Sequence, residues 1–73
     1  MTEQEWRERF AFQLRKIARS RGIYFQKDWA EAFELSENTI SRYRNSETTP
    51  DAYTIFRIAN ILGCSTDELI NFE

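Results

Sequence analysis

Apolar residues recur along most of this chain at intervals of three and four residues, the spacing of one face of an α-helix. The first such segment runs from residue 2 to residue 22, and its apolar face holds Phe10, Leu14 and Ile17. Thr2 and Glu5 are spaced as a capping box at its start. The pattern therefore predicts a long first helix that a glycine ends.

Two shorter helices are expected next. One covers about residues 26–33, with Trp29, Ala30 and Phe33 on its inward side. After a short turn, Ser36 is a good N-cap for another helix that reaches about Arg44. The following stretch, NSETTP, has the composition of a loop.

A fourth helix is predicted after this loop, capped by either Thr49 or Asp51 and ended by a glycine at position 63. Its apolar stripe consists of Ile55, Ile58, Ala59 and Leu62.

A short fifth helix opens at the capping box that Ser65 and Glu68 form. Leu69 must turn inward to complete the core, and helical spacing sends Ile70 and Phe72 to other faces. At least one of those two is expected to be exposed, so both are candidates for a homodimer contact. No alternating strand pattern is present, and residues 1–73 are predicted to form a single compact all-α domain of five helices.

Composition excludes several classes of function. The chain has no histidine and a single cysteine, Cys64, so no disulfide, metal site, cofactor site or nucleophile–base pair is expected, and the protein is predicted not to be an enzyme. Its longest uncharged run is far shorter than the about 20 residues of a membrane span. The first ten residues lack the apolar core of a signal peptide. A cytoplasmic protein with no small-molecule ligand is expected.

Charge is unevenly distributed. The net charge is −2 and the sequence pI is about 5.1, which argues against nucleic acid because dedicated binders are usually basic. However, residues 7–27 hold seven basic side chains and one acidic side chain, and residues 28–37 hold four acidic side chains and no basic one. The sign of the charge on one part of the surface matters more than the net charge of the chain for attracting a charged partner.

From Phe10 to Ile70 the chain resembles the XRE family, the Cro and lambda-repressor-like helix-turn-helix regulators. The resemblance rests on QKDWAEAFELSENTISRYRNSETTP followed by IFRIANILGCSTDELI. It implies a five-helix lambda-repressor-like DNA-binding domain with its motif at about residues 26–45. It also implies a sequence-specific transcriptional regulator, a small stand-alone repressor that inserts the third helix into the major groove of double-stranded DNA.

The spacing of the motif has a physical reason. A helix-turn-helix needs a small residue where its helices cross, and Ala30 occupies that position. Five apolar residues beside the crossing fix the third helix: Trp29, Phe33, Leu35, Ile40 and Tyr43. The opposite side of the third helix then projects outward.

Four residues share this outward side and are the candidates for base contact: Glu37, Asn38, Ser41 and Arg42. Asn38 is suited to adenine, and Arg42 to guanine or a phosphate, although both could be ordinary solvated residues. Glu37 could accept a hydrogen bond from cytosine, or its charge could simply be stabilised by the dipole at the helix N-terminus.

Phosphate contacts are expected at the start of the second helix, where the resemblance implies that Gln26 donates to the DNA backbone and Lys27 adds charge. Ser36 is mainly a cap and also a candidate. Weaker phosphate candidates are Arg44, Asn45 and Thr48.

The chain departs from the family pattern at several positions. Glu34 stands where the family often has glycine, and a positive φ there would be strained. An additional residue lies between Gly22 and Gln26. Tyr24 and Phe25 occupy this insertion and either pack the turn or touch the sugar-phosphate backbone of DNA, and packing is the favoured alternative.

Two charged features of the family are also missing. A buried arginine–glutamate pair is expected to be absent, because the matching positions hold Ala18 or Arg19, and Arg44. The loop after the third helix carries Glu47 in place of basic residues. Arg44 could pair with Glu47 or contact a phosphate.

Two alternative functions stay open. The acidic balance and Glu37 suit a protein-interaction module, such as an antitoxin or antirepressor. The chain could also be the N-terminal DNA-binding domain of a larger regulator.

Overall fold

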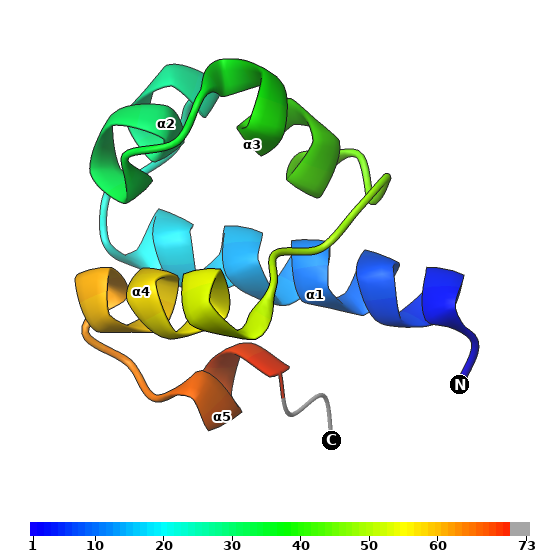
Figure 1. Ribbon diagram of the computed structural model, residues 1–73. Coiled ribbons are helices and arrows are strands. Elements are labelled where there is room, and N and C mark those ends of the chain that lie inside the picture. Colours follow the sequence, from blue (N-terminus) through cyan, green and yellow to red (C-terminus); the bar gives the residue numbers. More distant parts are fainter. Residues whose placement is uncertain (71–73) are drawn as a thin grey trace.

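The computed structural model describes residues 1–70, and these form five α-helices and no strand (Figure 1). The helices are α1 (Glu3–Ser20), α2 (Gln26–Phe33), α3 (Glu37–Arg44), α4 (Ala52–Leu62) and α5 (Thr66–Ile70). In Figure 1, α1 crosses the middle of the molecule, α2 and α3 lie above it, and α5 lies below. The predicted all-α fold is confirmed.

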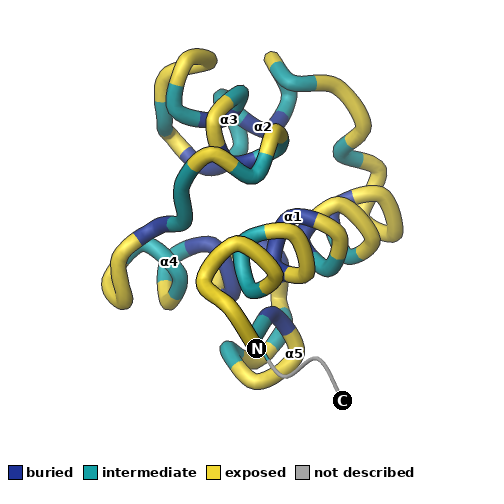
Figure 2. Tube along the Cα trace, turned by 90° about the vertical axis from the view of Figure 1, so that its right-hand side faces the viewer, coloured by how far each residue is buried: buried dark blue, intermediate teal, exposed yellow. Residues whose placement is uncertain are grey.

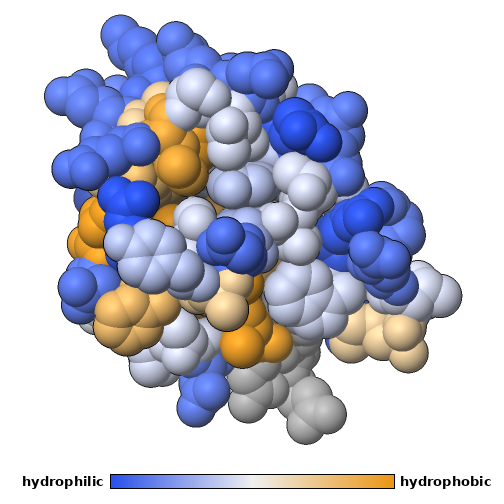
Figure 3. Space-filling model, viewed as in Figure 1, coloured by the Kyte–Doolittle hydropathy of each residue, from blue (hydrophilic) through white to orange (hydrophobic). Residues whose placement is uncertain are grey.

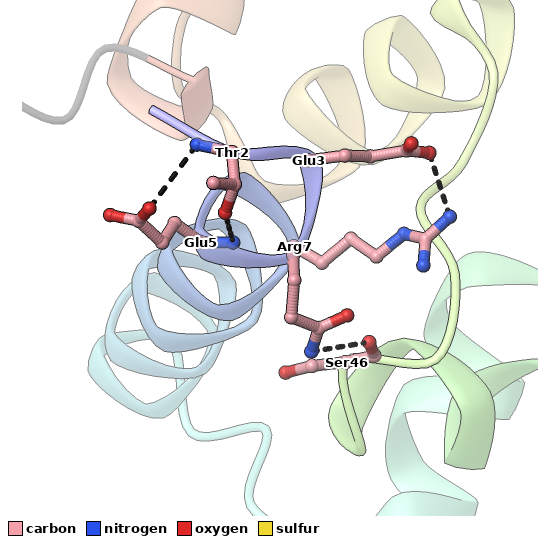
Figure 4. Close-up of polar contacts among 6 residues, drawn as sticks. Thr2, Glu3, Glu5, Arg7 and Ser46 are labelled. Carbon is pink, nitrogen blue, oxygen red and sulfur yellow. Dashed lines mark hydrogen bonds and ion pairs between the residues drawn. The ribbon is translucent and has the colours of Figure 1, made fainter.

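The helix ends are set by the expected caps. At the start of α1, the Thr2 hydroxyl accepts from the Glu5 amide at 3.1 Å, and the Glu5 carboxylate accepts from the Thr2 amide at 3.3 Å (Figure 4). The second capping box joins Ser65 and Glu68 in the same way, at 3.2 and 3.3 Å. Asp51, and not Thr49, caps α4, since its carboxylate accepts from the Thr54 amide at 2.8 Å.

The core lies where α1 meets the other helices, and Figure 2 shows buried segments on their facing sides. Its largest fully buried side chains are Phe10, Leu14, Trp29, Phe33, Ile40, Ile58 and Leu69. Trp29 is therefore a core residue, as predicted, and its indole N–H donates to the Ile23 carbonyl at 3.2 Å. The hydrogen bond satisfies the polar atom that burial of the ring takes out of water.

Glu34 ends α2 in the left-handed conformation, with φ 57° and ψ 44°. The Leu35 amide then donates to the Ala30 carbonyl at 3.0 Å, which closes the turn between α2 and α3. Gly63 ends α4 with φ 71°, so glutamate and glycine perform the same task at two helix ends. Only the glutamate carries the steric cost of its Cβ atom.

The segment before α2 differs from expectation. Tyr24 and Phe25 are 53% and 66% exposed, so the prediction that both pack the turn is wrong. Ile23 takes the inward place instead: its amide donates to the Ala18 carbonyl at 3.0 Å, and it packs against the core. The next two side chains are left in solvent, directly before Gln26.

None of the helices within residues 1–70 is sufficiently long and apolar to cross a membrane.

Candidate nucleic-acid interface

The pair α2–α3 is held together by its buried side. Ile40 and Tyr43 of α3 lie in the core with Trp29 and Phe33 of α2. Burial raises the pKa of the Tyr43 hydroxyl, with a smaller upward effect from Asp51 and a downward effect from Arg42. These apolar anchors fix α3 so that its other side faces solvent, as a recognition helix requires.

Three of the four candidate base-contact residues, Glu37, Asn38 and Arg42, are exposed on that solvent side. Figure 3 shows hydrophilic side chains along the upper edge, over α2 and α3. Within residues 1–70, the side chains of Asn38 and Arg42 make no hydrogen bond or ion pair. Their donors therefore remain available to an outside partner.

Ser41 is placed less favourably. It is half-buried, and its hydroxyl accepts from the Asn45 side-chain amide at 3.4 Å. Ser36 also serves its own helix, because its hydroxyl accepts from the Thr39 amide at 3.1 Å. Both hydroxyls thus support α3 from within, whereas Asn38 and Arg42 project from it.

The N-terminus of α2 lies beside that of α3. The Gln26 side-chain amide donates to the Glu37 carbonyl at 3.2 Å, which joins the two helix starts. Phe25, the N-cap of α2, has no side-chain oxygen to accept from the first amides of the helix. An anion such as a phosphate could take that place, because helix N-termini carry unsatisfied N–H groups and a partial positive charge.

Arg44 occupies an unexpected position. Its guanidinium lies over the Trp29 ring, 5.0 Å from the ring centroid, and its carbonyl accepts from the Arg15 guanidinium at 3.4 Å. Burial, followed by the charges of Arg15 and Arg19, lowers the pKa of Arg44. Arg44 makes no ion pair with Glu47 in the described part of the chain, so that alternative is not realised.

The predicted absence of a buried arginine–glutamate pair holds within residues 1–70, where Ala18 is fully buried and the two ion pairs are Glu3–Arg7 and Glu34–Arg57.

The loop after α3 is held to α1 through one of its backbone carbonyl groups. Ser46 has φ 60°, and its carbonyl accepts from the Gln4 side-chain amide at 3.4 Å (Figure 4). Next to it Asn45 is exposed and Thr48 is half-buried, so Asn45 is the more accessible of these two phosphate candidates. No sequence signal pointed to the left-handed serine, because serine has no particular preference for that conformation.

The fold and this surface define a class, the helix-turn-helix domains, and comparison with known proteins identifies the family. Residues 13–73 match the Cro/C1-type HTH DNA-binding domain. The chain belongs to this family, and the resemblance to XRE-family regulators is confirmed.

A named relative is the HTH-type transcriptional regulator ImmR of Bacillus subtilis (strain 168), which is 34% identical over 55 residues. The alignment covers 75% of this chain and 43% of the relative, so the chain spans less than half of the relative's length. No solved structure matches the chain.

Proposed function

We propose that this protein is a sequence-specific transcriptional regulator of the cytoplasm that inserts α3 into the major groove of double-stranded DNA. The observation that carries the proposal is the pair Asn38 and Arg42, exposed and without internal partners on a helix that Ile40 and Tyr43 fix from behind. Asparagine and arginine are the side chains best suited to adenine and guanine edges. The name of the relative, a transcriptional regulator, supports the same function.

Base and phosphate contacts fall on different helices in this proposal. Asn38 and Arg42 contact base edges, with Glu37 and Ser41 beside them. The N-terminus of α2, with Gln26 and Lys27, binds a backbone phosphate, and the Gln26–Glu37 hydrogen bond couples that phosphate to the start of α3. Phosphate contacts then set the orientation of α3, and base contacts supply the sequence preference. Ser36, Arg44, Asn45 and Thr48 remain secondary phosphate candidates.

Repression would follow from occupancy of an operator by two copies. A single module of this kind buries only about 600–1,000 Å² of protein surface on DNA, which limits its affinity. Two copies on a two-fold operator, with half-sites about 34–36 Å apart, would double the interface. Of the two dimer candidates from sequence, Ile70 is half-buried against the core, and Phe72 lies outside the described residues.

The experiment is a selection of random duplex DNA by the purified protein. We expect an enriched motif whose two halves are related by two-fold symmetry. Asn38→Ala should lose the preference at one position of each half, whereas Asn60→Ala, a matched change of an exposed asparagine on α4, should keep the whole motif. Absence of any enriched sequence would overturn the proposal and favour the protein-interaction alternative.

A further inference from the structure

The solvent side of α1 carries a segregated row of charges centred on one aromatic residue. The row consists of Glu5, Glu8, Phe12, Lys16 and Arg19, all exposed and spaced by three or four residues; we call it the α1 outer face. Such spacing places all five on one side of a helix. The acids lie in the N-terminal half of this face and the bases in the C-terminal half.

Phe12, at the centre, is 67% exposed. A shallow hollow lies on each side of its ring. One is lined by Glu5, Glu8, Arg9, Phe12 and Gln13, and the other by Phe12, Arg15, Lys16 and Arg19. A large apolar side chain between two hollows can act as a knob in helix packing, and the hollow beside it can accept the same side chain of a second helix.

Three of the four charged side chains of the face have no partner inside the described part of the molecule, and the fourth, Glu5, accepts from the Thr2 amide. Among residues 1–70, Glu8, Lys16 and Arg19 make no ion pair and no side-chain hydrogen bond. Glu3 and Arg7, one helical turn apart on the same helix, do pair with each other at 2.7 Å (Figure 4). The α1 outer face therefore presents both signs of charge to a partner.

The positions are symmetric about Phe12. Glu8 and Lys16 stand four residues before and after it, and Glu5 and Arg19 stand seven before and after. A two-fold axis through Phe12 consequently brings each acid opposite a base when two copies of α1 lie antiparallel. A parallel arrangement would set acid against acid and base against base.

We propose that the α1 outer face binds a second copy of this chain, with the two α1 helices antiparallel and the two Phe12 rings side by side. Glu8 then faces Lys16 of the second copy, and Glu5 faces Arg19 of the second copy, each pair occurring twice. Such a self-complementary patch is what an isologous two-fold contact requires. Arg9 and Arg15 flank the face at its edges, where water screens their repulsion.

One helix pair with a single aromatic contact per copy is small beside the about 1,200–2,000 Å² of a stable interface. The dimer is therefore weak in free solution and becomes favourable when two copies are held close together, as on adjacent half-sites. The contact between the two α1 helices needs no DNA, so an experiment on association can be carried out without DNA and tests the dimer separately from the proposed function.

Sedimentation over a range of concentrations tests the charge pairing. Glu8→Lys places like charges opposite each other twice in the dimer, and we expect association to weaken by about tenfold or more. The double variant Glu8→Lys with Lys16→Glu restores opposite charges at both places and should recover most of the association. A wild type that stays monomeric at every concentration overturns the proposal, as does a double variant no better than the single one.

Phe12→Ser tests the apolar centre. Its matched control is Phe56→Ser, which removes a phenylalanine of similar exposure, 61%, from α4. We expect only Phe12→Ser to abolish association, while circular dichroism shows both variants folded. Loss of association in Phe72→Glu alone would place the dimer at the C-terminal candidate and overturn the α1 contact. All of these variants should bind an isolated half-site as the wild type does, which keeps this test separate from that of DNA recognition.

Discussion

The guanidinium of Arg44 illustrates how a single residue can tie the recognition helix to the core. It lies over the buried Trp29 ring, and Arg15 and Arg19 lie near enough to lower its pKa further. The guanidinium of an arginine stays charged at neutral pH in proteins. With no carboxylate pairing with Arg44 within residues 1–70, the counter-charge best suited to it is a DNA phosphate.

Arg42 supports a direct prediction about specificity. Arg42→Ala should cost about 1–3 kcal/mol of operator binding and relax the base preference at one position of each half-site. The reason is the loss of a two-pronged donor from an exposed position on α3. Titration of the selected operator and of single-base variants measures both effects.

Two further variants act as controls for this prediction. Arg7→Ala removes an equal charge from α1, where Arg7 pairs with Glu3, and should leave operator binding nearly unchanged. Gln26→Ala should weaken specific and nonspecific DNA alike, since it perturbs a phosphate contact rather than a base contact. Unchanged operator affinity in Arg42→Ala would show that the base-contacting side of α3 is assigned wrongly.

At the level of elements, the turn between α2 and α3 depends on a strained residue. Glu34 has φ 57°, and its carboxylate is 3.3 Å from the Arg57 guanidinium of α4. The glutamate side chain of that ion pair is exposed, so the pair contributes only about 0–1 kcal/mol to the free energy of unfolding. Strain from the left-handed conformation, about 1–2 kcal/mol, is of the same size or larger.

A pair of substitutions separates strain from charge at this turn. Glu34→Ala removes the ion pair and keeps the strain, whereas Glu34→Gly removes both. The Glu34→Gly variant should therefore have a free energy of unfolding about 1 kcal/mol larger than that of the Glu34→Ala variant. Glycine adopts a positive φ freely, and this gain outweighs the additional entropy that glycine loses on folding. Urea denaturation of the two variants measures the difference, and an alanine variant at least as stable would contradict the strain.

The helices could be predicted because their signals are local. Thr2, Ser36 and Ser65 cap the helices that they were expected to cap. The cap of α4 stayed open between Thr49 and Asp51, since either can accept from an early amide of the helix. Tyr24 and Phe25 were misplaced because hydrophobicity alone favours burial, while the backbone had already turned Ile23 inward.

The candidate site was only partly predictable. The helical period alone placed Glu37, Asn38 and Arg42 on one exposed side. It could not reveal that the Gln26 amide reaches the Glu37 carbonyl or that Arg44 covers Trp29, because those contacts depend on how α2 and α3 cross. Contacts between elements require the angle and distance of packing, which a periodic pattern does not contain.

For the whole molecule, the net charge of −2 raises the question of how an acidic chain attracts a polyanion. The distribution of charge answers it only in part: Glu5 and Glu8 lie on α1 and Asp67 and Glu68 on α5, but Asp28, Glu31 and Glu37 lie on α2 and α3 themselves. The basic side chains proposed to meet DNA are few: Lys27, Arg42 and Arg44. Electrostatic attraction should therefore contribute less to binding than in strongly basic DNA-binding domains.

The salt dependence of operator binding follows from that count. Arg42 is assigned to a base edge, so Lys27 and Arg44 are the bases left to neutralise phosphates. Each neutralised phosphate contributes about −0.9 to the slope of log K against log salt concentration, so these two give about −1.8 per copy and about −3.6 for two copies. Titrations of the operator at a series of salt concentrations measure the slope. A slope near −10, the value of lac repressor, would need further bases such as Arg15, Lys16 and Arg19 to contact phosphates. That result would contradict the placement of Lys16 and Arg19 against a second copy of α1, because one side chain cannot neutralise both a phosphate and a partner's carboxylate.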